Sequence, residues 1–130
     1  MRAIGIFICN LTMMAALAQP PSRFYATYGG SADDFAYACK LGLDGSYVIC
    51  GSSSSGGNGQ TDMYFLQLDS MGQKILEKYI GGAGNEVGKG IVLLNDSGYI
   101  LAGYTSSFGN GGYDMYLVRI DKYGTILWQR

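Results

Sequence analysis

The sequence predicts an all-β protein made of two stacked four-stranded antiparallel sheets. The first observation is a duplication without gaps. From Phe24 onward, residue n corresponds to residue n+52, so that Asp62-Met63-Tyr64 returns as Asp114-Met115-Tyr116. The second is composition, with 21 glycines and 11 tyrosines but two prolines, as in strands joined by glycine turns. A period of about 50 residues is typical of units that bury their apolar surface against copies of themselves.

Residues 1–18 have the pattern of a secretory signal peptide. A positive start at Arg2 precedes an apolar run, and Ala16-Leu17-Ala18 forms a small-x-small cleavage site. The alternative is an N-terminal membrane anchor, but the run is shorter than the roughly 20 residues that a span needs. We therefore expect residues 19–130 to form one repeat region that is secreted, periplasmic or at the cell surface, with no membrane segment after cleavage.

Charge and composition limit the function classes. Nine basic residues stand against ten acidic ones, and no basic patch suggests a nucleic-acid partner. The chain contains no histidine, which removes the commonest general base and metal ligand. We therefore expect no catalytic residue, no metal and no cofactor.

Each copy, about residues 25–76 and 77–130, is expected to contain two hairpins. In the first copy, the first hairpin turns at Asp44-Gly45, a pair suited to a two-residue type I′ turn. The second turns at Asp69-Ser70-Met71-Gly72, which fits a type I turn closed by a left-handed residue. The predicted strands are 35–41, 47–51, 63–68 and 74–78, followed by 87–93, 99–103, 115–120 and 126–130.

The third strand of each copy discriminates between architectures. Met63-Tyr64-Phe65-Leu66 and its counterpart Met115-Tyr116-Leu117-Val118 are apolar on both faces, whereas a strand with one wet face would alternate. Burial on both faces suits a sheet between two neighbours, so four strands per repeat predict propeller-like blades. A β-sandwich or β-prism is the alternative.

Several strings carry a resemblance to a known class of repeat, among them Tyr28–Tyr37, Asp44–Ser53, Thr61–Gly72, Gly98–Ser107 and Ile120–Trp128. Over residues 24–130 the chain resembles the tandem β-propeller repeats of large secreted bacterial proteins. The resemblance implies blades in an array, and it implies no activity, because such repeats are mostly uncharacterised. The segment from Asp121 to Trp128 is also similar to the tryptophan-docking motif of quinoprotein propellers. Its turn is one residue shorter and Leu76 stands in the first copy, so no quinone cofactor is implied.

The ends of the repeat predict an incomplete array. Phe24–Tyr28 aligns with Leu76–Ile80, the fourth strand of a blade, and is expected as an orphan N-terminal strand. Arg130 aligns with Lys78, inside such a strand. Because closed rings take about four to eight blades, three interpretations are open: a piece of a longer array, assembly of copies into a ring, or an open two-blade unit with exposed edges. We expect self-association or pairing with further repeats.

Cys39 and Cys50 are the cysteines that follow the signal sequence. A two-residue turn at 44–45 would place them directly opposite each other on adjacent strands, where an oxidising compartment permits a disulfide. The alternative is two buried thiols that pack as small hydrophobic groups. Their apolar equivalents, Ile91 and Ala102, favour this alternative.

Glycine-rich loops supply the candidate ligand residues. Asn58 and Asp62, with their counterparts Asn110 and Asp114, offer side-chain oxygens suited to calcium or to sugar hydroxyls. Ordinary turn chemistry, with Asn in left-handed conformations and Asp capping backbone amides, explains the same residues.

A second pair of loops carries Asp33-Asp34 and Asn85-Glu86. Two carboxylates can act in glycoside hydrolysis, but Asn85 breaks the pattern in the second copy. We interpret both as solvated loops.

These observations favour a secreted, non-catalytic repeat module that binds or spaces, with a glycan, a cell surface or a protein as its contact. The alternative is a fragment of a propeller enzyme whose active site lies in blades outside this chain. The lack of histidine and of an acidic constellation repeated in both copies favours the first.

Overall fold

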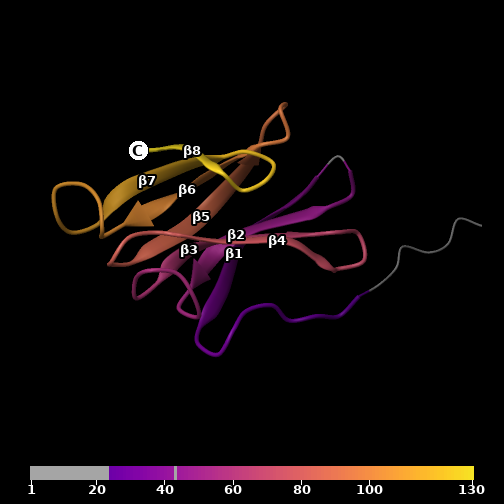
Figure 1. The fold of residues 1–130 in the computed structure, drawn as a ribbon, viewed down its shortest axis with the longest axis horizontal. Coiled ribbons are helices and arrows are strands. Elements are labelled where there is room, and N and C mark those ends of the chain that lie inside the picture. The colour runs from indigo at the N-terminus through magenta and orange to yellow at the C-terminus, as the bar shows by residue number, and fades with distance from the viewer. Residues whose placement is uncertain (1–23, 43) are drawn as a thin grey trace, which may run out of the picture.

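A computed structural model describes residues 24–42 and 44–130, so the predicted signal peptide at 1–18 lies outside the described residues. Figure 1 shows two neighbouring sheets, one from each copy of the repeat. Across the described residues the chain forms no helix, and so none that is long and apolar enough to cross a membrane. The strands are β1 (Asp34–Leu41), β2 (Tyr47–Ser53), β3 (Asp62–Leu68) and β4 (Lys74–Ile80), then β5 (Glu86–Leu93), β6 (Tyr99–Thr105), β7 (Asp114–Ile120) and β8 (Ile126–Gln129).

Both sheets are meanders in which each strand pairs with the next along the chain. Their orders are β1-β2-β3-β4 and β5-β6-β7-β8, and every pair is antiparallel. The predicted all-β fold with four strands per copy is therefore confirmed. The two sheets do not close on each other into a barrel or ring.

The hairpin turns share one geometry, which corrects one of the two turn predictions. At the second hairpin the amide of Gly72 donates to Asp69 O at 3.1 Å, and Gly72 has φ of +79°, which confirms the type I turn closed by a left-handed residue. At the first hairpin the amide of Gly45 donates to Gly42 O at 3.1 Å with φ of +80°. The predicted type I′ turn is wrong, because this hairpin closes between Gly42 and Ser46 and is one residue wider.

The wider turn shifts the register of β1 against β2 by one residue. Cys50 lies opposite Ala38, and Cys39 lies opposite Ile49. Because successive side chains of a strand point to opposite faces, Cys39 is exposed while Cys50 is buried, and both thiols are free. The direct pairing of the two cysteines is thus wrong, and no disulfide joins them.

Each sheet carries a β-bulge at the same repeat position. The pairing of β1 with β2 shifts at Tyr37, and the pairing of β5 with β6 shifts at Lys89, so each is an extra residue in its strand. Near the bulges lie Gly51 and Gly103, where a Cβ would come 1.8 Å from a carbonyl oxygen of the facing strand. This close approach requires glycine at both positions.

Opposite faces of the two sheets form the core between them. Met63 and Phe65 of β3 are completely buried, and so is Val118 of β7. Val118 is the equivalent of Leu66, whose side chain points to the other face of β3. The sheets therefore stack front to back, which is the relation between neighbouring propeller blades. The core comprises Val48, Cys50, Met63, Phe65, Ile80, Ile91, Tyr99, Leu101, Tyr116, Val118 and Ile120.

The segment before β1 forms no strand, which corrects the orphan strand expected at Phe24–Tyr28. Its position nevertheless follows the repeat. The Phe24 ring lies against Gly72, as the Leu76 side chain lies against Gly124 one repeat later. A fourth strand pairs with the third strand of its own sheet, and the described residues provide no such partner for this segment.

Candidate functional site

The loops that the sequence singles out meet at the junction between the two sheets. The amide of Gln60 donates to Gly84 O at 3.0 Å, and the amide of Glu86 donates to Thr61 O at 2.7 Å. Thr61 and Asn85 form a parallel β-bridge. The glycine-rich loop before β3 is therefore held to the loop before β5 by backbone hydrogen bonds.

Asp62, at the start of β3, is buried in this junction with 1% of its surface exposed. Its Oδ2 accepts a hydrogen bond from the amide of Gly59 at 3.1 Å, which is the predicted turn chemistry. Its Oδ1 is buried and has no hydrogen-bond partner among the described residues. Asn58, in the same loop, is exposed.

Glu86, at the start of β5, has no exposed surface, which corrects the solvated loop expected at Asn85-Glu86. Its carboxylate accepts hydrogen bonds from Thr105 Oγ1 at 2.6 Å, from the amide of Gly82 at 2.7 Å and from the amide of Ser107 at 3.2 Å. Burial acts to raise the pKa of Glu86, but these hydrogen bonds outweigh it and lower the pKa. Glu86 is therefore an ionised carboxylate inside the junction.

The two buried carboxylates converge on Gly81. A Cβ at Gly81 would lie 2.3 Å from Glu86 Oε2 and 2.4 Å from Asp62 Oδ1, so the two oxygens are separated by no more than the sum of these distances. Two buried carboxylates this close repel each other unless a proton or a cation compensates. Among the described residues no three His, Cys, Asp or Glu side chains gather as a metal site.

The equivalent acids lie apart, at the two open ends of the pair of sheets. Asp34, the equivalent of Glu86, accepts hydrogen bonds from the amide of Gly30 at 2.8 Å and from Ser55 Oγ at 2.7 Å. Asp114, the equivalent of Asp62, accepts one from the amide of Asn110 at 3.2 Å. The structure therefore does not gather Asn58, Asp62, Asn110 and Asp114 into one site.

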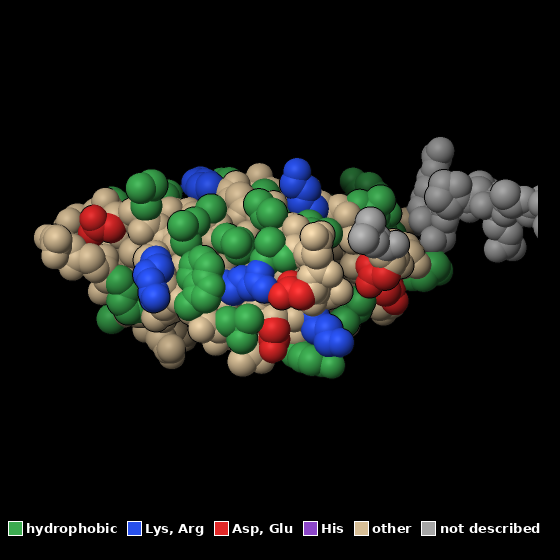
Figure 2. Space-filling view, turned by 90° about the horizontal axis from the view of Figure 1, so that it is seen from above, with side chains coloured by type: hydrophobic (Ala, Val, Ile, Leu, Met, Phe, Trp, Pro, Cys, Tyr) green, Lys and Arg blue, Asp and Glu red, His purple; other side chains and the backbone are tan. Residues whose placement is uncertain are grey.

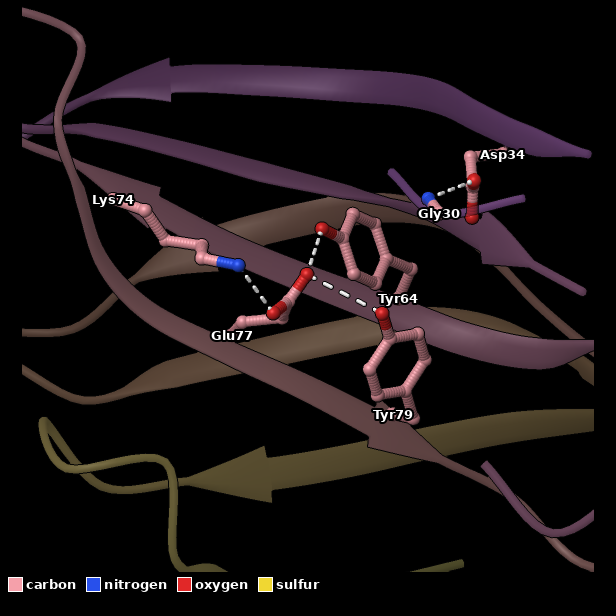
Figure 3. A network of polar contacts seen from close by, with 6 residues as sticks. All are labelled: Gly30, Asp34, Tyr64, Lys74, Glu77 and Tyr79. Atoms are coloured by element: carbon pink, nitrogen blue, oxygen red, sulfur yellow. Dashed lines mark hydrogen bonds and ion pairs between the residues drawn. The ribbon is translucent and has the colours of Figure 1, made fainter. Parts of the chain in front are cut away.

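A second polar cluster surrounds Glu77 on β4, and Figure 3 shows the neighbouring side chains pointing toward it. Tyr64 donates its hydroxyl to Oε1 at 2.6 Å, Lys74 donates to Oε2 at 2.6 Å, and Tyr79 donates at 3.3 Å. The hydrogen bonds from Lys74 and then Tyr64 lower the pKa of Glu77. Burial, followed by the bond to Glu77, raises the pKa of Tyr64.

The second sheet keeps the geometry of this cluster but not its charge. There the hydroxyl of Tyr116 donates to Gln129 Oε1 at 2.7 Å, and Gln129 is the equivalent of Glu77. A neutral amide supports the tyrosine but cannot act as a general acid or base. The cluster therefore joins the third strand to the fourth.

An apolar cavity of about 410 Å³ opens on the outer face of the first sheet, between the segment before β1 and strands β1 to β3. Its wall includes Cys39, Tyr47, Ile49, Tyr64, Leu66 and Leu68. These are the repeat equivalents of six core residues of the second sheet: Ile91, Tyr99, Leu101, Tyr116, Val118 and Ile120. The cavity is therefore the counterpart of the face that forms the junction, and here the segment before β1 lies over part of it, so that Leu66 is 2% exposed.

The Asp62–Glu86 pair was not predicted from the sequence. A signal was present, because an acid stands at the positions of Asp34 and Glu86 in both copies, each shortly after a Gly-Gly pair. No protein-family model matches the chain, and a comparison with curated proteins finds no match. The class that fold and site define is an all-β protein of two open four-stranded antiparallel sheets.

Proposed function

We propose that the chain is a secreted, non-catalytic repeat module that binds or spaces as part of a larger array of blades. The observation that supports this is front-to-back stacking, because the second sheet then presents at its outer end the same face of the repeat that the first sheet buries at the centre. Met63 is 0% exposed inside the junction, whereas its equivalent Met115 is 90% exposed. An apolar face of this kind suits a further blade.

The polar groups of the chain support a structural role. The acids of the junction are sealed from solvent, and the Glu77 cluster loses its charge in the second copy. Figure 2 shows hydrophobic side chains spread over the face seen from above, with basic and acidic side chains among them. Phe108 and Tyr113, in the loop before β7, are exposed aromatics of the kind that contact sugars or protein partners.

The array is tested by lengthening it. A chain extended after Arg130 by a second copy of residues 79–130 continues the repeat in register. In stacked arrays each new interface adds stability, so we expect the extended chain to unfold in urea at a higher midpoint and with a larger m value. A Met115→Asp substitution in the extended chain, at the new junction, should remove the gain in midpoint. An added repeat that leaves the midpoint unchanged would contradict the proposal.

A further inference from the structure

We infer that the outer face of the second sheet of one copy docks on the outer face of the first sheet of another copy, head to tail. The inference rests on the proposed function and names a partner for its end faces, namely a second copy of this chain. The internal junction is the template, because the residues on its two sides have repeat equivalents on the outer faces of the two sheets.

The apolar contacts follow from the repeat. In the internal junction, Met63 and Phe65 of β3 pack against the second sheet. Their equivalents in β7 are Met115, 90% exposed, and Leu117, 42% exposed. The surface that receives them is the cavity of about 410 Å³ on the first sheet of the other copy, whose wall carries the equivalents of the receiving core residues.

The two backbone hydrogen bonds across the internal junction also have repeat equivalents, whose donors and acceptors lie at opposite ends of the pair of sheets. The hydrogen bond from Gln60 to Gly84 corresponds to one from the amide of Gly112 to Ala32 O. The bond from Glu86 to Thr61 corresponds to one from the amide of Asp34 to Tyr113 O. Docking in the template geometry therefore forms two backbone hydrogen bonds between copies.

The fourth strand of the second sheet is completed in the same arrangement. Ile80 of β4 pairs with Met63. Met115 pairs with Tyr104 of β6 on one side, and among the described residues β8 provides no partner for it on the other side. Tyr28 occupies the repeat position that follows β8, as Ile80 does in β4. In the docked pair, Tyr28 of the receiving copy therefore comes opposite Met115 of the incoming copy.

One adjustment is required for docking. In the docked pair, residues 24–26 of the receiving copy would occupy the same space as residues 128–130 of the incoming copy, because both are repeat equivalents of residues 76–78. One of these two segments must therefore move. Backbone hydrogen bonds between Arg130 and Leu117 hold the end of β8 against β7, whereas residues 24–26 form no strand and Tyr25 is fully exposed, which makes the segment before β1 the one that moves. Because the two surfaces differ, the contact is heterologous and repeats into a ring or a filament.

Cysteine cross-linking tests the register directly. Across the internal junction a Cβ at Gly88 would lie 2.3 Å from Cys50 Sγ, and the equivalent positions are Ala36 and Ala102. Two variants, Ala36→Cys and Ala102→Cys, are made in a chain whose native cysteines are replaced (C9S, C39S, C50A), expressed with its own N-terminal segment, mixed and oxidised. We expect a covalent dimer in the mixture and little in either variant alone.

A matched control uses Tyr123→Cys with Ala36→Cys. Tyr123 is exposed in the turn between β7 and β8, and its equivalent Met71 stays exposed beside the internal junction. Cross-linking of the control pair as fast as the test pair would overturn the inference, as would faster dimerisation of Ala36→Cys alone.

Sedimentation tests the association without cross-linking. Wild type should sediment as oligomers at micromolar concentration and the Met115→Asp variant as a monomer, so a monomeric wild type would also overturn the inference. In the extended chain, the added repeat can stack on the second sheet within one molecule whether or not separate copies associate. A failure of docking between copies is therefore distinguishable from a failure of the proposed array.

Discussion

The ammonium group of Lys89 lies 3.2 Å from the centre of the Tyr37 ring, and these two residues are repeat equivalents. Each is the extra residue of the bulge in the first strand of its sheet. The bulge that bends the strand thus also brings the first strands of neighbouring sheets into contact. A cation over the face of a ring is attracted by its quadrupole, so this contact joins the two sheets at one edge of the junction.

Lys89→Met should lower the free energy of unfolding by about 0.5–1 kcal/mol, the range for a cation–π contact at an exposed site. The contribution of the pair is isolated by a double-mutant cycle with Tyr37→Leu, measured by urea denaturation. The control pair is Lys122 and Tyr123, which lie within one turn with the Lys122 ammonium group 5.0 Å from the centre of the Tyr123 ring. Their cycle should give a smaller coupling. Equal coupling in the two cycles would contradict a role for Lys89 in joining the sheets.

Met63→Ala and Met115→Ala compare the same residue in a covered and an open junction. Removing a buried methionine side chain costs about 2–5 kcal/mol of stability, and we expect that loss for Met63→Ala. Met115→Ala should change the free energy of unfolding by less than about 0.5 kcal/mol in dilute protein. Urea denaturation at low protein concentration measures both, and similar losses in the two variants would show that the open face is covered.

Asp62→Asn should stabilise the fold by about 1 kcal/mol. The amide oxygen can still accept from the amide of Gly59, and the new NH₂ replaces the unpartnered Oδ1 and can donate toward Glu86. The substitution also removes repulsion between two buried carboxylates. The matched control is Asp114→Asn, at the open end, which should be neutral. Urea denaturation in the presence of a chelator checks the prediction, and a destabilised Asp62→Asn variant would refute it.

The strands were predictable because their signals are local. Glycine turns and aliphatic runs recur at fixed offsets, and the two copies support each other. The register of the first hairpin was not predictable, because Asp44-Gly45 suits two turns of different length. In one, Gly45 is the second residue of a type I′ turn. In the other, which the structure adopts, Gly45 is a left-handed residue whose amide donates to Gly42 O, and the pairs from Ala38 to Leu41 shift by one.

The Asp62–Glu86 pair was not predictable from either loop alone. Each acid is separated from the other by a whole strand pair, and they meet because the second sheet stacks on the first. Sequence patterns assign Asp62 to ordinary turn chemistry and Glu86 to a solvated loop. The first assignment is right, since Asp62 Oδ2 caps its own loop, and the second is wrong, since Glu86 is buried. The burial of Glu86, which acts on the pKa of its carboxylate, depends on the neighbouring sheet and so is not visible in the local sequence.

The two cysteines should differ in reactivity. Cys50 is completely buried, and burial raises the pKa of its thiol to about 12, so the thiolate that reacts with alkylating or disulfide reagents is scarce. Cys39 is exposed. In the native protein we expect Cys39 to be labelled and Cys50 to be protected until urea is added. Mass spectrometry of the labelled peptides checks this, and unlabelled Cys39 in the native state with both labelled in urea would show that its face is covered.

The stability of the fold should fall in acid because carboxylates at the junction and on β4 are ionised in the folded state. The pKa values of Glu86 and Glu77 lie below the ordinary value of 4.5. Their contribution is therefore fully present above that value and is lost as the pH falls through the lower pKa of the folded state.

Glu86→Gln should lower the urea midpoint at neutral pH, because the hydrogen bonds from Thr105 and Ser107 lose their charged acceptor. The urea midpoint of this variant should also fall less than that of wild type as the pH is lowered below 4.5, since the group no longer titrates. Glu77→Gln, at a more exposed position, should show both effects more weakly. A Glu86→Gln midpoint that follows pH as steeply as wild type would assign the acid sensitivity to other carboxylates.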